Sequence, residues 1–150
     1  MAFEWELRDI VSSVWTAIGE APLRPGSVRP PRWDDQAAVT ATVRLSGGWG
    51  GAIRVELPAR TAERIAQRLG LAAAPGVDAS AAAVGALAET VADRYVPLLA
   101  DRILVSAPEV SRGASVLSGF VVVLSESFSA GDDGVVVSVL QESRRASPGV

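Results

Sequence analysis

The sequence predicts a single α+β domain in which a largely antiparallel sheet packs against long helices. Three stretches carry apolar residues at helical spacing, and strand-like apolar runs lie before the second stretch and after the third. The predicted order is helix, two strands, two helices, three strands, and such grouped strands are typical of α+β proteins. A chain of 150 residues can bury a self-sufficient core. We assign the domain to residues 1–142 and a disordered polar tail to 143–150.

The third stretch, residues 78–100, predicts the helix around which the chain is organised. Asp78 or Ser80 can cap its start, and Pro97 should kink or end it after Val96 because proline lacks a backbone donor. The apolar stripe expected to face the core consists of Val84, Leu87, Val91 and Leu98. A second stripe, small at its start and acidic at its end, consists of Ala82, Ala86, Glu89 and Asp93.

Two shorter helices are predicted earlier in the chain. The first spans residues 4–18, where the apolar stripe is Leu7, Ile10, Val11, Val14 and Ile18, and Trp5 and Trp15 flank it as core aromatics. The second spans residues 58–69, and its stripe is Ala62, Ile65, Ala66 and Leu69. Arg60, Arg64 and Arg68 form a basic ridge on this helix, which we interpret as a solvated face.

Alternating side chains predict a β-hairpin made of residues 38–45 and 52–57. Its first strand should be half-buried, with Val39, Ala41, Val43 and Leu45 inward and Thr40, Thr42 and Arg44 outward. The glycine-rich turn at 46–51 lacks the lysine and the following helix of a phosphate-binding loop. Trp49 in that turn is expected to pack on a neighbour or a partner. The proline-rich segment 20–36 is predicted to be a surface loop.

Three more strands are predicted at residues 102–106, 114–126 and 134–142, with a turn at 129–134. The runs FVVVLS and VVVSVL are apolar at nearly every position. We therefore expect both faces of these strands to be covered, the second face within the chain or by another subunit. Phe120 to Leu124 and Val135 to Leu140 exceed what one helical layer can cover, which predicts self-association.

The composition excludes several kinds of chemistry. The chain has no histidine, cysteine, lysine or asparagine, and all 14 basic residues are arginine. The commonest general base and the usual metal ligands are thus missing, and we expect no metal and no cofactor. A net charge of −3 gives no basic footprint for nucleic acid. No apolar run approaches the ~20 residues of a membrane span and no signal peptide is recognisable, so a cytoplasmic protein without a membrane partner is expected.

Three segments resemble the CheX-like chemotaxis phosphatases. They are LSGGWGGAIRVELP (45–58), VGALAETVADRYVPLL (84–99) and LVSAPEVSRG (104–113), and the resemblance extends over residues 5–142. In that family a long helix reads Gly-Glu-Leu-Ala-Asn. The resemblance implies that the acid pairs with the active-site lysine of a response regulator, while the amide orients the water that attacks an aspartyl phosphate.

This chain departs from the family pattern at both functional positions. Ala86 stands where the acid would be and Glu89 where the amide would be. An amide can accept from water and donate to a phosphoryl oxygen at once, whereas an ionised carboxylate only accepts. We therefore expect no catalytic residue here, and identify Ala82, Ala86, Glu89 and Asp93 as the candidate partner-binding face.

Three functions remain open on the sequence. The first is a non-catalytic module that binds a CheY-like response regulator receiver domain or another signalling partner, or simply forms a homodimer. The second is an active aspartyl-phosphate phosphatase that uses unfamiliar residues. The third is a structural dimerisation domain outside two-component signalling. Loss of phosphate from a phosphorylated regulator separates the second from the others, and pull-down with receiver domains separates the first from the third.

Overall fold

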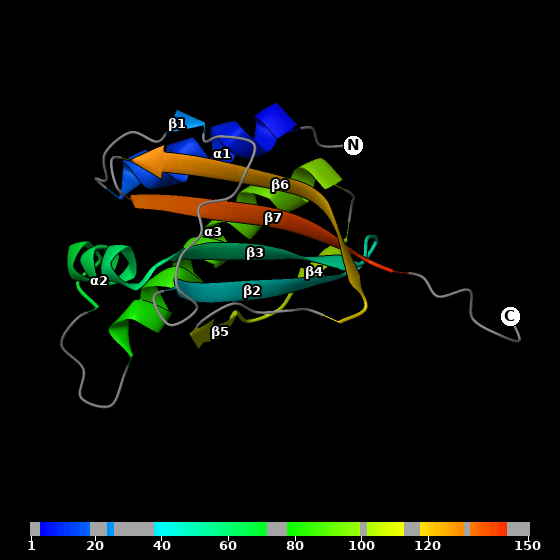
Figure 1. Cartoon of the computed structure of the whole chain (residues 1–150). Coiled ribbons are helices and arrows are strands. Elements are labelled where there is room, and N and C mark those ends of the chain that lie inside the picture. The colour runs from blue at the N-terminus through cyan, green and yellow to red at the C-terminus, as the bar shows by residue number, and fades with distance from the viewer. Residues whose placement is uncertain are drawn as a thin grey trace, which may run out of the picture.

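The computed structural model describes residues 4–18, 24–25, 38–71, 78–99, 102–112, 118–130 and 133–143. Its elements, in chain order, are α1 (Glu4–Ala17), β1 (Arg24–Pro25), β2 (Ala38–Gly47), β3 (Gly51–Pro58), α2 (Ala59–Arg68), α3 (Ala79–Leu99), β4 (Ile103–Val105), β5 (Glu109–Arg112), β6 (Phe120–Ala130) and β7 (Asp133–Glu142) (Figure 1). The strands form one sheet in the order β1-β6-β7-β3-β2-β4, and β5 also pairs with β2. Every pairing among the described strands is antiparallel. The predicted α+β class and the largely antiparallel sheet are confirmed.

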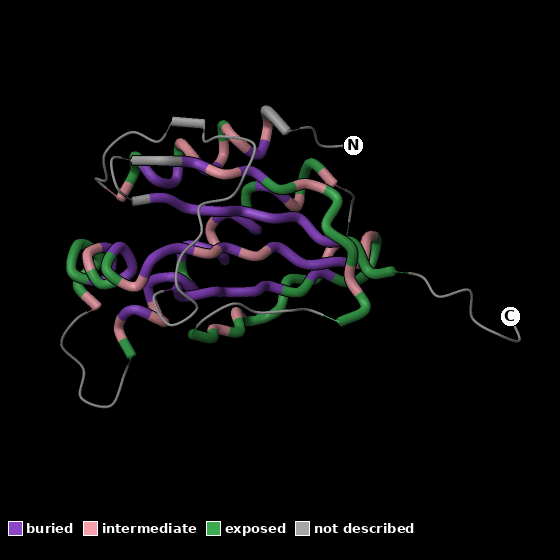
Figure 2. The backbone as a smooth tube through the Cα atoms, in the orientation of Figure 1, coloured by how far each residue is buried: buried purple, intermediate pink, exposed green. Residues whose placement is uncertain are grey.

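The core lies between the sheet and the three helices, with α3 running along the sheet (Figure 1). Alternate residues of the central strands face the helices: Val39, Ala41 and Val43 from β2, Ile53, Val55 and Leu57 from β3, and Val135, Val137 and Val139 from β7. The buried backbone runs through the middle of the sheet and along the inner sides of the helices (Figure 2). The predicted stripes of the helices supply the other half of this core, and Trp15 is 1% exposed within it.

Most of the predicted elements are present, with corrections at their ends. α3 continues through Pro97 to Leu99, so proline does not end the helix. Pro97 lies in the last turn, where its missing N–H removes a single bond to the exposed Asp93. Leu98, predicted to face the core, is 39% exposed, and the next residue, Leu99, packs against the core instead. Asp78 caps the helix; Ser80 is buried in the first turn.

The predicted strand at 114–126 is displaced toward the C-terminus. β6 starts at Phe120, after a turn in which Gly119 has φ of +83°, a backbone conformation that interrupts a strand. Two short strands were not predicted. β5 carries three exposed polar residues around the half-buried Val110 and pairs with the edge of β2. β1 lies in the predicted loop 20–36, where Arg24 and Pro25 pair with Ser129 and Phe128; the rest of that loop lies outside the described residues.

The prediction that β2 is only half-buried is wrong. Thr40 and Thr42, expected in solvent, are 1% and 4% exposed. β2 is an inner strand that pairs with β3 on one edge and with β4 and β5 on the other. On that same face, the ring of Phe120 from the bent start of β6 lies 5.9 Å from Arg44 Cζ. Alternation in sequence indicates which face is polar, but it does not indicate whether that face meets water.

The two apolar runs of the last hairpin have different environments. Val135 to Leu140 are buried within the chain, which confirms that this run is covered on both faces and corrects the expectation that it needs another subunit. Val121, Val122 and Val123 are 54%, 48% and 52% exposed. β6 bends where the register shifts between Val122 and Leu124, and this places the three valines at the edge of the sheet.

Of the predicted tail, only Ser143 is among the described residues. Its backbone N–H donates a hydrogen bond to the carbonyl oxygen of Gly119, with an N···O distance of 2.8 Å.

Candidate functional site

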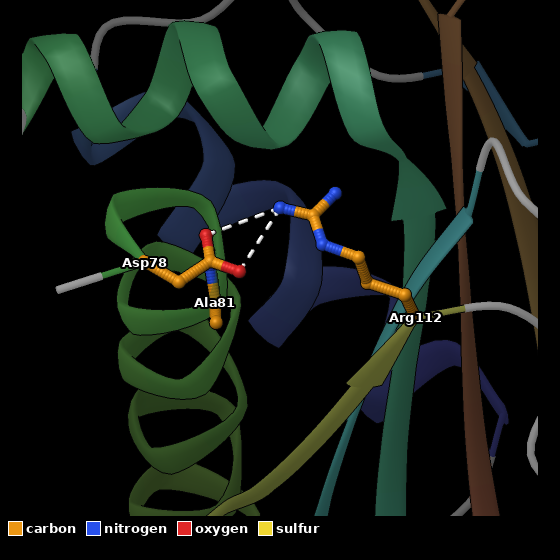
Figure 3. A network of polar contacts seen from close by, with 3 residues as sticks. All are labelled: Asp78, Ala81 and Arg112. Atoms are coloured by element: carbon orange, nitrogen blue, oxygen red, sulfur yellow. Dashed lines mark hydrogen bonds and ion pairs between the residues drawn. The ribbon is translucent and has the colours of Figure 1, made fainter. Parts of the chain in front are cut away.

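The start of α3 is fixed by an N-cap that is also an ion pair. Asp78 Oδ1 accepts the backbone N–H of Ala81 at 3.2 Å, and Arg112 Nη2 donates to both carboxylate oxygens at 3.2 and 3.0 Å. Figure 3 shows the arginine reaching from β5 to the first turn of the helix. The N–H of Ala81, and next the Arg112 guanidinium, hold the pKa of Asp78 below its ordinary value of 3.8. One side chain thus satisfies a free helix donor and ties α3 to the sheet edge.

We expect Asp78→Ala to lower the free energy of unfolding at pH 7 by about 1 kcal/mol, the usual size for loss of a cap. Because the pKa of Asp78 is lower in the folded chain than in the unfolded chain, its carboxylate stabilises the fold at pH values above the unfolded pKa, near 3.8. That stabilisation is lost as the pH falls through the lower pKa of the folded chain. Urea unfolding at a series of pH values should therefore show wild type and variant converging in acid. Arg112→Gln keeps the cap and loses only the ion pair. Because the ion pair is exposed, this variant should lose less free energy of unfolding than Asp78→Ala. An equal loss in the two variants would contradict the view that the cap contributes most of the stabilisation.

A glycine sets how closely α3 approaches β5. A Cβ placed on Gly85 would lie 3.2 Å from Pro108 Cγ and 3.5 Å from Val110 Cγ2. The absence of a side chain therefore lets this side of α3 pack against the segment that carries β5. Together with Asp78 at the helix start, this contact determines which side of α3 is turned away from the sheet.

The side turned outward carries the predicted partner-binding face. Ala86, Glu89 and Asp93 are exposed, and Ala82 is half-buried at its start. Residues three apart on a helix have Cβ atoms about 5–6 Å apart, so the side chains of Ala86 and Glu89 can touch one partner together. Glu89 and Asp93 make no hydrogen bond or ion pair with any described residue. The structure therefore brings the four residues together as a solvent-exposed face with two uncompensated carboxylates.

Sequence reasoning missed the neighbours of this face. Thr90 Oγ1 donates to Ala86 O at 2.8 Å, and Arg94 Nη1 donates to Ser13 Oγ of α1 at 3.1 Å. The stripe of Thr90 and Arg94 borders a cavity between the three helices. A helical period in one stretch cannot show a cavity whose other walls come from distant stretches.

Trp49, whose role the sequence left open, packs against the core of the chain itself. Its ring lies across Gly51, where an added Cβ would collide with it. Among the described residues, no three acidic side chains gather as metal ligands would. None of the helices in the described ranges combines the length and apolar character that crossing a bilayer requires.

The comparisons with known proteins concern the fold. CheX from Vibrio vulnificus matches with a TM-score of 0.70 and 16% identity, over 93% of this chain and 95% of that chain. A chain of the CheX-CheY-BeF3-Mg2+ complex from Borrelia burgdorferi matches with a TM-score of 0.67 and 19% identity, over 94% and 99%. A CheC-like protein from Shewanella sp. PV-4 matches with a TM-score of 0.66 and 18% identity, over 93% and 98%. No protein-family model and no curated protein matches the sequence. The chain thus has, over nearly its whole length, the fold of the CheX- and CheC-like chemotaxis proteins that its motifs resemble.

Proposed function

We propose that this chain is a non-catalytic signalling module that binds a CheY-like receiver domain through the outward face of α3. The observation that carries the proposal is that Ala86 and Glu89 are both exposed on this face, at the positions where the resemblance places an acid and an amide. The match to a chain from a complex that contains CheY supports a receiver domain as the partner. The face is formed by Ala82, Ala86, Glu89 and Asp93.

The chemistry of the face favours binding over catalysis. Dephosphorylation requires that the negative charge of the phosphoryl group be neutralised and that a water molecule be held in line. Ala86 has only a methyl group, and the carboxylate of Glu89 adds negative charge where charge must be neutralised. The same two residues can still take part in docking, since an exposed carboxylate can pair with a cation on a partner.

The test is binding of purified receiver domains, with and without BeF3 and Mg2+, measured by surface plasmon resonance. We expect measurable binding that Glu89→Arg with Asp93→Arg weakens at least about tenfold, equivalent to ~1.4 kcal/mol. Glu142→Arg, at the C-terminal end of β7 and outside this face, makes the same acid-to-arginine change at one position and should leave binding unaltered. If no receiver domain binds, or if the α3 variant binds as wild type does, the proposal is wrong.

A second candidate, a structural dimerisation domain outside two-component signalling, is favoured by the apolar edge of the sheet. Val121, Val122 and Val123 of β6 are 54%, 48% and 52% exposed, whereas Leu104 and Val105, which are 70% and 37% exposed, belong to β4 at the opposite edge of the sheet. β4 pairs with the last residues of β2, and Phe120 of β6 lies over Arg44 of the same strand. The run of three exposed valines in β6 is an apolar surface of the kind that marks a protein–protein contact more often than isolated exposed residues do.

Self-association is therefore expected, as a homodimer joined through this edge. Sedimentation at tens of micromolar should give the mass of a dimer, and Val121→Glu with Val123→Glu should shift it to monomer because two charges would be buried in the contact. Leu98→Glu changes an exposed leucine on α3 and serves as the matched control. A monomeric wild type, or a dimer that both variants retain, would exclude this contact.

A further inference from the structure

A cavity of about 150 Å³ lies between the three helices, beside the candidate partner-binding face. Its apolar walls include Val14 and Ile18 at the end of α1, Ile65 and Leu69 on α2, and Ala86 and Leu87 on α3. Ala17, which also lines it, is exposed, as is Ala86, so the cavity opens to solvent between α1 and α3. A solvent-accessible cavity lined mainly by apolar side chains with a few polar groups at its edge has the character of a small-molecule site.

The polar atoms around the cavity define what that occupant must be. The hydroxyl of Thr90 is directed back to Ala86 O at 2.8 Å and makes its hydrogen bond within the helix. Arg94 is therefore the one charged side chain on the wall. Among the residues that the structure describes, its guanidinium makes a single polar contact, to Ser13 Oγ at 3.1 Å, and none to a carboxylate. The apolar walls suit a hydrocarbon group, and the positive charge of Arg94, which no described carboxylate neutralises, suits an anionic group on the same ligand.

We propose that this cavity binds a small monocarboxylate whose apolar part has about six carbons. An aliphatic cavity of about this volume admits a molecule the size of benzene, which limits the apolar part to a short chain or one ring. The planar guanidinium of Arg94 has donors free to form two parallel hydrogen bonds with a carboxylate. The hydrocarbon part would replace water against the seven apolar side chains that line the cavity, and the carboxylate would remain at the solvent-exposed end.

The experiment titrates the intact chain with hexanoate, 1-hexanol and hexylammonium, which share the hydrocarbon part and differ in charge. Binding is followed by two-dimensional amide NMR, which reports both affinity and location. We expect hexanoate to shift resonances of α1, α2 and α3, to bind at least about tenfold more tightly than hexanol, and hexylammonium not to bind. Arg94→Gln should abolish the preference for the acid while hexanol binding persists.

Filling the cavity provides the structural control. Ala17→Leu and, on the opposite wall, Ala86→Leu should each abolish hexanoate binding, and both positions are exposed enough to accept the larger side chain. Thr16→Leu makes the same change at an exposed neighbour that does not line the cavity, and should bind as wild type does. The inference is overturned if hexanoate does not bind at millimolar concentration, if hexanol binds equally well, or if both cavity-filling variants, shown folded by their spectra, still bind. Receiver binding is measured separately, so this result leaves the proposed function standing or falling on its own test.

Discussion

Val91→Asp is expected to lower the free energy of unfolding of the chain severely. Val91 is 1% exposed in the middle of α3 and belongs to the core between this helix and the sheet. An unpaired carboxylate there would lose its hydration without compensation. Such changes cost about 4 kcal/mol or more, against a total stability of about 5–15 kcal/mol for a typical domain.

Urea unfolding followed by circular dichroism measures this loss, and two further variants separate its causes. Val91→Ala removes the side chain without adding charge and should cost about 1–3 kcal/mol through the cavity that it leaves. Leu98→Asp introduces the same charge on the same helix at a position that is 39% exposed, and should stay folded. A folded Val91→Asp protein with near wild-type stability would show that α3 does not pack on the sheet through this stripe.

Wild-type chain is expected not to accelerate loss of phosphate from any receiver domain, whereas Ala86→Glu with Glu89→Asn is expected to do so. Both positions are exposed on the same face of α3, so the new acid and amide would be presented to a docked partner three residues apart. Holding one water and shielding one phosphoryl group lowers a barrier by a few kcal/mol, and each ~1.4 kcal/mol is tenfold in rate. We expect at least a tenfold acceleration for the double variant.

The measurement mixes each protein with phosphorylated receiver domains and follows release of phosphate against the receivers alone. The single variants Ala86→Glu and Glu89→Asn should show little activity, because each lacks one of the two functions. Activity in the double variant would show that the docking face is kept and only the catalytic groups differ. A tenfold acceleration by wild type that Glu89→Ala abolishes would instead make Glu89 catalytic and exclude the non-catalytic proposal.

The helix α3 could be predicted because its period and its cap depend on local chemistry, whereas the motif positions on it came from the resemblance to a family. The spacing of Val84, Leu87 and Val91 is set by the 3.6-residue period of the helix, and all three are buried as predicted. Asp78 could be recognised as a cap because its side chain bonds to a backbone N–H three residues away. The exposure of Ala86 and Glu89 follows from the same helical period once the buried side is known.

Tertiary structure decided what depends on contacts between distant segments. Thr40 and Thr42 are polar, yet they are buried because β2 lies inside the sheet, and no local pattern reports how that face is covered. The two residues of β1 and the polar β5 are strands only because β6 and β2 provide their hydrogen-bonding partners. Arg112 meets Asp78, and Arg94 meets Ser13 beside a three-helix cavity, across separations of 34 and 81 residues. Sequence by itself thus determined the helix, its cap and its outward face, because these arise within a few turns of one segment. The arginine that pairs with the cap and the α1 and α2 walls of the cavity beside that face come from elsewhere in the chain, and only folding brings them to α3.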